Sequence, residues 1–212
     1  MVSPKIVKEL NKSVYGNNVG FRMSGEEVAM KLCDSVEIKI GGINFHHPYV
    51  AVFDIMSLLP EEFERIDGII SMKTFQNNEI TLNLSDNKII VETEDSFKEK
   101  IKNMNLIRSR FANGPSGSEL DIFIGISAYS RLWWFLFDSG NIAETKISEN
   151  TAREWASYRE NEITEVGNYK FEIAGDTIAA PTVIDNIIYD GALSYDFIRQ
   201  SEFAISLADK KI

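Results

Sequence analysis

The sequence predicts a mainly β protein with a few short helices, built from two copies of one unit. Segments in which apolar and polar residues alternate, as they do in strands with one buried face, recur along the chain, at 35–40, 79–84, 119–126 and 169–173. A second observation is an internal repeat in the sequence. The third is the composition of the 212 residues, 44% hydrophobic and 25% charged, which is ordinary for a globular protein and sufficient for a substantial core.

The repeat is clearest in two segments that align without a gap, 67–89 (DGIISMKTFQNNEITLNLSDNKI) and 190–212 (DGALSYDFIRQSEFAISLADKKI). Their identical positions are Asp67/Asp190, Gly68/Gly191, Ser71/Ser194, Glu79/Glu202, Leu84/Leu207, Asp86/Asp209, Lys88/Lys211 and Ile89/Ile212. Upstream, IGGINFHHP at 40–48 matches IAGDTIAAP at 173–181. Because the matching segments alternate or are apolar, each copy is expected to be a β-rich unit.

The repeat divides the chain into a first lobe at 1–94 and a second lobe at 119–212. The segment between them, 95–118, is expected to contain a connecting helix, from the spacing of Phe97, Ile101 and Met104 within 95–111. It is expected to end in a linker rich in Gly, Pro and Ser. The linker is placed at 111–119. Two further elements are predicted, namely a helix at 145–158 and a helix beginning at Pro60 in an insertion of the first copy.

Charge and hydropathy exclude several classes of partner. Lys and Arg number 22 and Asp and Glu 32, so the net charge is −10, and no basic stripe is present. This argues against binding to nucleic acid or to an anionic membrane. No run of apolar residues is long enough to predict a membrane span. The first ten residues lack an apolar h-region, so the chain as given predicts no signal peptide, and its compartment is left open.

The residue types present restrict the chemistry of any active site. The single cysteine excludes an intrachain disulfide and a Cys-rich zinc site. With only two histidines, the sequence offers little base for a Ser/His or Cys/His nucleophile and argues against such catalysis. Carboxylates would therefore carry any catalysis. The apolar run LWWFLF at 132–137 leads directly into Asp138, Ser139 and Gly140. A carboxylate there has surroundings that disfavour its charge, and it is either an ordinary turn residue or a catalytic group.

The order of these segments resembles the retropepsin and pepsin superfamily of aspartic peptidases, and most closely the bacterial retropepsin-like aspartyl proteases. In that family an apolar strand ends in Asp-Thr/Ser-Gly and is followed by a flap hairpin, an Ile-Gly-Gly strand and a DGILG-DFL segment. The corresponding segments here are VEIKIGG at 36–42, IDGIISMKTF at 66–75 and YDGALSYDFI at 189–198. The resemblance covers nearly the whole chain and implies an acid-protease-like fold with two β-barrel lobes.

The resemblance also implies an activity, the hydrolysis of peptide bonds by a water molecule that a pair of carboxylates activates. Asp138 would be one of the two required aspartates. Ser139 would donate its hydroxyl to a hydrogen-bond network beneath the site. Gly140 would permit a tight turn and direct its N–H toward the carboxylate. No metal or organic cofactor is implied.

Contacts with a peptide or protein substrate are assigned by the same resemblance. The stretch 19–32 stands where the first lobe's flap hairpin would be, with its turn at Ser24 and Gly25. Met23, Ser24, Gly25 and Asn141 are therefore candidates for substrate binding. The corresponding stretch of the second copy, 159–169, is shorter, and one flap for two lobes is the pepsin arrangement.

The first copy lacks a counterpart of Asp138. If Lys5 is aligned with Lys146, the matching position falls before Met1. Three interpretations follow, namely a fragment of a longer two-lobed peptidase that lacks an N-terminal segment, a homodimer in which each chain contributes one Asp138, or a catalytically inactive relative that binds a peptide or protein.

Individual residues also depart from the family pattern. Ser71 and Ser194 stand where the family has glycine, and Asn141 stands where it has a small or hydroxyl residue. Asp67 and Asp190, which each precede glycine, are expected to be structural turn residues.

Overall fold

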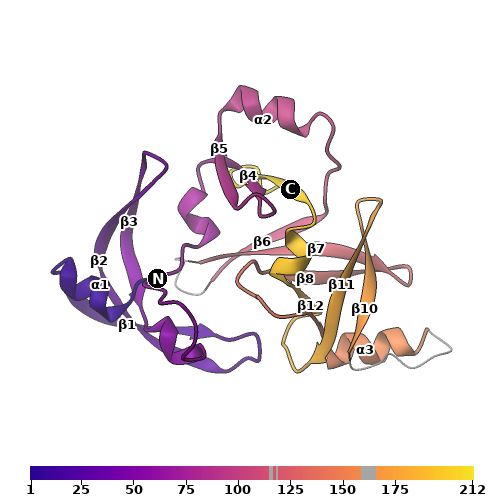
Figure 1. Ribbon diagram of the computed structural model, residues 1–212, viewed down its shortest axis with the longest axis horizontal. Helices are drawn as coiled ribbons and strands as arrows, with labels where there is room; N and C mark the ends of the chain where they lie inside the picture. Colours follow the sequence, from indigo (N-terminus) through magenta and orange to yellow (C-terminus); the bar gives the residue numbers. More distant parts are fainter. Residues whose placement is uncertain (115–116, 118, 159–165) are drawn as a thin grey trace. The chain divides into compact units, whose positions relative to one another are not determined.

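The computed structural model of the chain describes residues 1–114, 117, 119–158 and 166–212 (Figure 1). It confirms the predicted mainly β class, with 47% strand and 17% helix and a closed β-barrel. The chain forms two compact units, one of residues 1–22, 26–74 and 113–120, the other of residues 23–25, 75–112 and 121–212.

The described residues of the first unit form one antiparallel sheet and one α-helix, besides shorter 3₁₀ turns. Its strands are β1 (Val14–Phe21), β2 (Glu27–Ile40) and β3 (Ile43–Val52), in the order β1-β2-β3, and the helix is α1 (Pro4–Glu9). The hairpin predicted at 19–32 is present, because β1 and β2 pair on either side of a turn. A small core holds the sheet and helix together, formed by Val7, Cys33, Val36, Val50 and Val52.

The second unit is built on a closed barrel of six strands. Its order is β10-β11-β9-β12-β8-β7, and the pairing of Glu172 with Ser127 joins β10 to β7 and closes the ring. The strands are β7 (Leu120–Ala128), β8 (Arg131–Phe137), β9 (Thr145–Ser148), β10 (Val166–Ile173), β11 (Asp176–Asp185) and β12 (Gly191–Leu193). Inside it lie buried aromatic side chains, including Trp133, Phe135, Trp155, Phe171 and Phe197.

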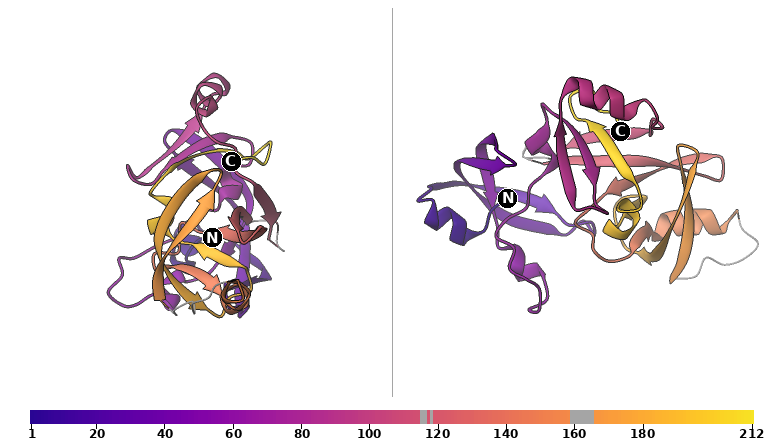
Figure 2. Two further views of the ribbon diagram at one scale, coloured as in Figure 1. Left: turned by 90° about the vertical axis from the view of Figure 1, so that its right-hand side faces the viewer. Right: turned by 45° about the horizontal axis from the view of Figure 1, so that its top comes forward.

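Further elements of this unit lie next to the barrel. Strand β6 (Ser109–Asn113) pairs with β7, and helices α3 (Glu149–Ala156) and α4 (Tyr195–Ile198) follow β9 and β12. A second sheet has the order β13-β4-β5, with β4 (Glu79–Asn83), β5 (Lys88–Glu92) and β13 (Glu202–Ser206). Helix α2 (Glu94–Ile101) packs against its three strands (Figure 2).

The two copies of the repeat pair with each other in this second sheet. Strands β4 and β13 are equivalent segments, and they run antiparallel with Thr81 opposite Ala204. These two residues are also equivalent in the repeat, so the pairing is symmetric about them. The pairing explains why β4 and β5 belong to the second compact unit. The first lobe that the repeat predicts at 1–94 stays a prediction.

The turns of the two copies also share their backbone conformation. Asn87 and Lys210, which are equivalent in the repeat, have φ values of 55° and 56°. The hairpin turns at 41–42 and 174–175 have φ values of 55° and 88° in the first copy and of 51° and 95° in the second. A left-handed conformation at matching positions is uncommon outside glycine, so the repeat is structural as well as sequential.

The structure corrects the predicted alignment of the start of the first copy. Ser3 and Ser148 cap α1 and α3 with their side chains. Their N–H groups donate to the carbonyl of the aspartate in each copy of Asp-Gly, at 2.8 and 3.0 Å. Ser3 therefore matches Ser148, and the predicted match of Lys5 with Lys146 is wrong. In the corrected register the counterpart of Asp138 still falls before Met1.

Several predicted helices and the predicted linker have different bounds. The helix expected over 95–111 ends at Ile101, and Met104 lies beyond it. The helix expected over 145–158 is preceded by strand β9, because Ser148 caps α3. The prediction of a helix beginning at Pro60 is wrong, because the residues after Pro60 form turns, and the 3₁₀ helix of the insertion (Ile55–Leu58) ends before it.

The predicted linker at 111–119 connects two paired strands. Its first residues belong to β6, and the N–H of Gly114 donates to the carbonyl of Glu119 at 3.2 Å, which joins β6 to β7. Its residues 115–116 and 118 lie outside the described residues, as do residues 159–165 of the predicted short second hairpin.

Asp190 has the structural role that was predicted for it. Its Oδ2 accepts the backbone N–H of Trp134 at 2.7 Å, which fixes the turn before β12 against β8. Asp190→Ala would leave this part-buried N–H without its acceptor, and we expect a loss of about 1 to 3 kcal/mol in the free energy of unfolding. Urea unfolding monitored by tryptophan fluorescence measures it, with the exposed Asp196→Ala as a control. Equal stability of the two variants would contradict the assigned role.

Candidate active-site loop around Asp138

Asp138 lies at the end of an internal barrel strand. Alternate residues of β8 are buried, ending with Phe137, and the strand finishes immediately before the aspartate. Strand β12 runs parallel to β8, with Leu193 opposite Phe137. This pairing of β8 with β12, which belongs to the later segment YDGALSYDFI, fixes the position where Asp138 leaves the barrel.

The carboxylate of Asp138 is half-buried and is held by the backbone of its own loop. Its Oδ1 accepts the N–H of Gly140 at 2.9 Å. Burial raises the pKa of Asp138 above its ordinary value, while hydrogen bonds from the N–H groups of Gly140 and Asn141 act in the opposite direction. Asp138 therefore keeps its proton to a higher pH than an exposed aspartate does.

Asn141 holds this loop in place. It is 7% exposed, and its Nδ2 donates to the carbonyl of Glu144 at 3.1 Å. Its N–H donates to the carbonyl of Asp138 at 3.1 Å, and its carbonyl accepts the N–H of Tyr195 at 2.8 Å. These bonds give Asn141 a structural role that the sequence did not indicate, and its predicted contact with substrate stays a prediction.

Gly140 directs its N–H toward the carboxylate of Asp138, as predicted, but the predicted need for glycine in the turn is not borne out. Its φ lies outside the left-handed region, so the turn itself does not demand glycine. A Cβ on Gly140 would stand 3.1 Å from Oδ1 of Asp138, closer than most such contacts. Glycine therefore allows the close approach of the carboxylate to the backbone N–H.

A buried pair of hydroxyl groups lies next to the loop, and it is formed by residues other than Ser139. Ser139 is half-buried, and its predicted hydrogen bonds stay a prediction. A buried pair is formed by the hydroxyls of Thr145 and Ser194, 3.1 Å apart, and the N–H of Ser194 donates to Oγ1 of Thr145 at 3.2 Å. The side chain of Ser194 thus has its hydrogen-bond partner within the barrel.

The other predicted substrate contacts, Met23, Ser24 and Gly25, form the turn between β1 and β2. They group with the second unit, where the N–H of Ile188 donates to the carbonyl of Met23 at 2.9 Å. Gly25 has a φ of 84°, which favours glycine at this position of the turn. Their role in substrate binding stays a prediction.

Asp121 and Tyr189 are part of the site and were missed from the sequence. Burial raises the pKa of Tyr189, and the negative charges of Asp121 and Asp138 raise it further. The ring of Tyr189 meets that of Phe123 edge-on at 5.2 Å. Strands β7 and β8 pair as far as Phe123 opposite Leu136, and Asp121 and Asp138 each lie two residues beyond that pair. The alternation in ELDIFIGI could have placed Asp121 on this face.

No protein-family model and no curated protein matches the chain. Among the described residues, no three metal-binding side chains gather as a cation site would require. The described helices are all too short or too polar to cross a membrane.

Asp138 is expected to make stability depend on pH. Because its pKa is raised in the folded state, its contribution to stability is complete below the unfolded pKa, near 4, and is lost as the pH rises through the folded pKa. We therefore expect Asp138→Asn to be more stable than the wild type at pH 7, with the difference shrinking at about pH 3.5. Thermal unfolding at both pH values measures it. If the difference in stability between the variant and the wild type is the same at both pH values, the raised pKa of Asp138 is contradicted.

Proposed function

We propose that the chain is an aspartic-peptidase-like protein that hydrolyses peptide bonds, with Asp138 as one of two required carboxylates. The observation that carries this proposal is the state of Asp138. It is a half-buried carboxyl group with a raised pKa, located where an internal barrel strand ends and held by the N–H of Gly140. Such perturbation is typical of catalytic acids and bases.

In the proposed reaction, an ionised carboxylate accepts a proton from water while the water oxygen attacks the carbonyl carbon of the peptide. The protonated partner donates its proton to the carbonyl oxygen. The C–N bond then breaks as the leaving nitrogen takes a proton, giving a carboxylic acid and an amine. The raised pKa of Asp138 suits it to the protonated role.

The second carboxylate would come from another copy of the chain or from a segment before Met1. These sources differ in their dependence on concentration. A dyad completed by a second copy makes activity per chain rise with protein concentration until the dimer is saturated, whereas a dyad within one chain makes it constant.

The experiment is cleavage of an unfolded, alkylated protein substrate between about pH 3 and 7, the range in which a carboxylate pair sharing a proton operates. It is done with the longest native form of the chain at several concentrations. Cleavage that depends on Asp138 supports the proposal. If no condition gives cleavage, the proposed activity is wrong.

An inactive peptide- or protein-binding module on the same fold is the second candidate. It is favoured because burial, rather than a second carboxylate, raises the pKa of Asp138 within the described chain. Under this alternative an unfolded peptide binds without being cleaved, and Asp138→Asn leaves its affinity unchanged.

A further inference from the structure

Strand β1 forms one edge of the sheet in the first unit, and among the described strands β2 is its neighbour. Its sequence, VYGNNVGF, contains no charged residue. Tyr15, Val19 and Phe21 are 59%, 42% and 53% exposed. Edge strands are usually protected from pairing by lysine, proline or a bulge, and here a bulge between Val14 and Gly16 interrupts only the start of the strand. Most of the outer edge of β1 is therefore suited to receive another strand.

The hydrogen bonds between β1 and β2 show which backbone groups point outward. At the turn between the two strands, the N–H of Arg22 donates to the carbonyl of Glu26 at 2.9 Å. The register continues from there without a shift as far as the bulge. Because the direction of the N–H and C=O groups alternates along a strand, those of Asn17, Val19 and Phe21 point away from β2.

The internal repeat does not bring another strand to this edge. Residues 40–48 match 173–181, so Lys39 of β2 is equivalent to Glu172 of β10. In the second copy β7 joins β10 at Glu172. Strand β1 pairs with β2 only between Glu27 and Cys33, so the equivalent position lies beyond β1. The outer edge of β1 is thus a property of the hairpin itself.

Two copies of this edge fit each other in a two-fold register. Antiparallel pairing places outward-directed residues opposite one another. With Asn18 opposite Asn18 of the second copy, Asn17 lies opposite Val19 and exchanges main-chain hydrogen bonds with it, and Tyr15 comes next to Phe21. Aromatic cross-strand contacts of this kind stabilise a sheet. Because the strand is uncharged, two chains of net charge −10 meet here without like charges opposite each other.

The side chain of Asn18 gives a second reason for this register. Its Nδ2 is buried and has no hydrogen-bond partner among the described residues, and an unpaired buried donor costs free energy. On the two-fold axis Asn18 forms a non-hydrogen-bonded pair with its counterpart, the kind of pair in which side chains are closest. After a rotation about χ2, the Nδ2 of each amide can donate to the Oδ1 of the other.

We propose that the outer edge of β1 is an interface for a second copy of this chain, whose own β1 adds antiparallel with Asn18 on the two-fold axis. The main chain supplies the hydrogen bonds, as in other cases of recognition by strand addition. An isologous contact closes on itself, so the product is a dimer rather than a filament. The proposal concerns the first unit and does not depend on the proposed function, because the edges pair whether or not Asp138 is catalytic.

Sedimentation velocity of the full chain at several concentrations tests the interface, and we expect a reversible equilibrium between monomer and dimer. Val19→Pro removes an outward N–H from each copy and none that bonds to β2, so the Kd of the dimer should rise at least about tenfold. Val19→Lys brings like charges close to the axis and should act in the same direction.

Ile43→Lys is the matched control for Val19→Lys. Ile43 is 40% exposed and begins β3, on the opposite side of the same sheet. The substitution makes a similar change at a similarly exposed side chain, and the Kd of the dimer should stay unchanged. Circular dichroism checks that all three variants fold.

Cross-linking tests the register. Asn18→Cys places two thiols opposite each other across the axis at a Cα separation of about 4.5 Å, which a disulfide can span. Oxidation by air with a copper catalyst should therefore give a covalent dimer. Asn17→Cys is the control, because its thiol lies out of step with its counterpart in this register. The native Cys33 is fully buried and stays in place.

A chain that stays monomeric up to about 1 mM would overturn the proposal, since weaker association is not specific. A dimer that both Val19 variants leave intact would place the interface elsewhere. Association that grows beyond a dimer would show open-ended pairing instead of a closed contact. Cross-linking through position 17 as readily as through position 18 would contradict the two-fold register.

Discussion

Asp138→Asn is expected to lower the rate of peptide-bond hydrolysis by about 10²- to 10⁴-fold, the range that positioned proton transfer contributes. Asparagine has nearly the same shape, and its side-chain oxygen can still accept the N–H of Gly140. It cannot accept or donate the catalytic proton. The loop is also held through Asn141, whose backbone bonds the substitution does not touch. The variant therefore tests chemistry with little change in structure.

The control for this experiment is Asp86→Asn. Asp86 is an exposed carboxylate on the β4–β5 turn, where it pairs with Lys88 at 3.4 Å. The Asp86→Asn substitution removes one carboxyl group, as Asp138→Asn does, but at a position where no role in hydrolysis is proposed. Loss of cleavage in the Asp138 variant alone supports the proposed peptidase. Similar rates for both variants and the wild type would assign the observed cleavage to another group or to a contaminating enzyme.

Alternation and repetition predicted much of the fold because both reflect burial. The alternating segments at 35–40, 119–126 and 169–173 all became strands with one face inward. The repeat correctly indicated equivalent turns. Closure of the barrel depends on contacts such as Glu172 with Ser127, which are far apart in sequence and have no local signal.

The position of Asp138 could be read from the sequence, but its surroundings could not. The apolar run before it predicted a buried strand, and the strand ends where expected. The register of β7 on β8 next to it depends on the turn between the two strands. There Tyr129 and Ser130 adopt φ values of 52° and 60°, a conformation usually indicated by Asn or Gly. The sequence at Tyr129 and Ser130 therefore gave no signal for a tight hairpin.

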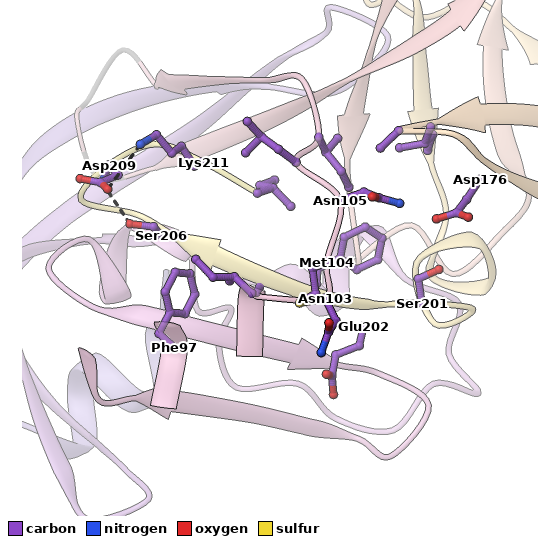
Figure 3. Close-up of a pocket in the computed structure, with 18 of the residues that line it drawn as sticks. Phe97, Asn103, Met104, Asn105, Asp176, Ser201, Glu202, Ser206, Asp209 and Lys211 are labelled. Carbon is purple, nitrogen blue, oxygen red and sulfur yellow. Dashed lines mark hydrogen bonds and ion pairs between the residues drawn. The ribbon is translucent and has the colours of Figure 1, made fainter. Parts of the chain in front are cut away.

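The groove of about 420 Å³ along β13 (Figure 3), whose walls also include the segment after α2 and the β10–β11 hairpin, was missed for a related reason. The spacing of Phe97, Ile101 and Met104 predicted one helix face, and a continuous helix would have used all three for packing. The helix ends at Ile101, and both Ile101 and Met104 line the groove. Helix length is decided here by where the chain turns toward β6, a tertiary constraint that periodicity does not contain.

Gly191→Ala is expected to cause the largest loss of stability among single-methyl substitutions in the second unit. Gly191 is buried in β12, and a Cβ there would lie 2.2 Å from Cε1 of Phe135. Phe135 is itself fully buried, and its ring packs against Trp155 and Phe171 at centroid distances of 6.3 and 5.7 Å. The ring has no free space into which it could move. Overpacking of this kind costs about 1 to 3 kcal/mol and occasionally more.

The measurement is urea unfolding followed by tryptophan fluorescence, because all three tryptophans, Trp133, Trp134 and Trp155, lie in the second unit and report on it alone. Gly16→Ala is the control, since its Cβ would meet Leu32 at an ordinary 3.7 Å. Because Gly16 lies in the first unit, unfolding of this control is followed by circular dichroism, which reports on both units. We expect that control to stay within about 0.5 kcal/mol of the wild type.

A double-mutant cycle separates the clash with Phe135 from a general intolerance of β12. Phe135→Leu removes ring atoms and destabilises the barrel by leaving a cavity. If the ring is the cause, Gly191→Ala should cost clearly less in the Phe135→Leu background, with a coupling energy of about 1 kcal/mol or more. Costs that simply add would show that the glycine is needed for the backbone of β12. The close approach of Gly191 to the ring of Phe135 would then not be the reason that β12 requires glycine.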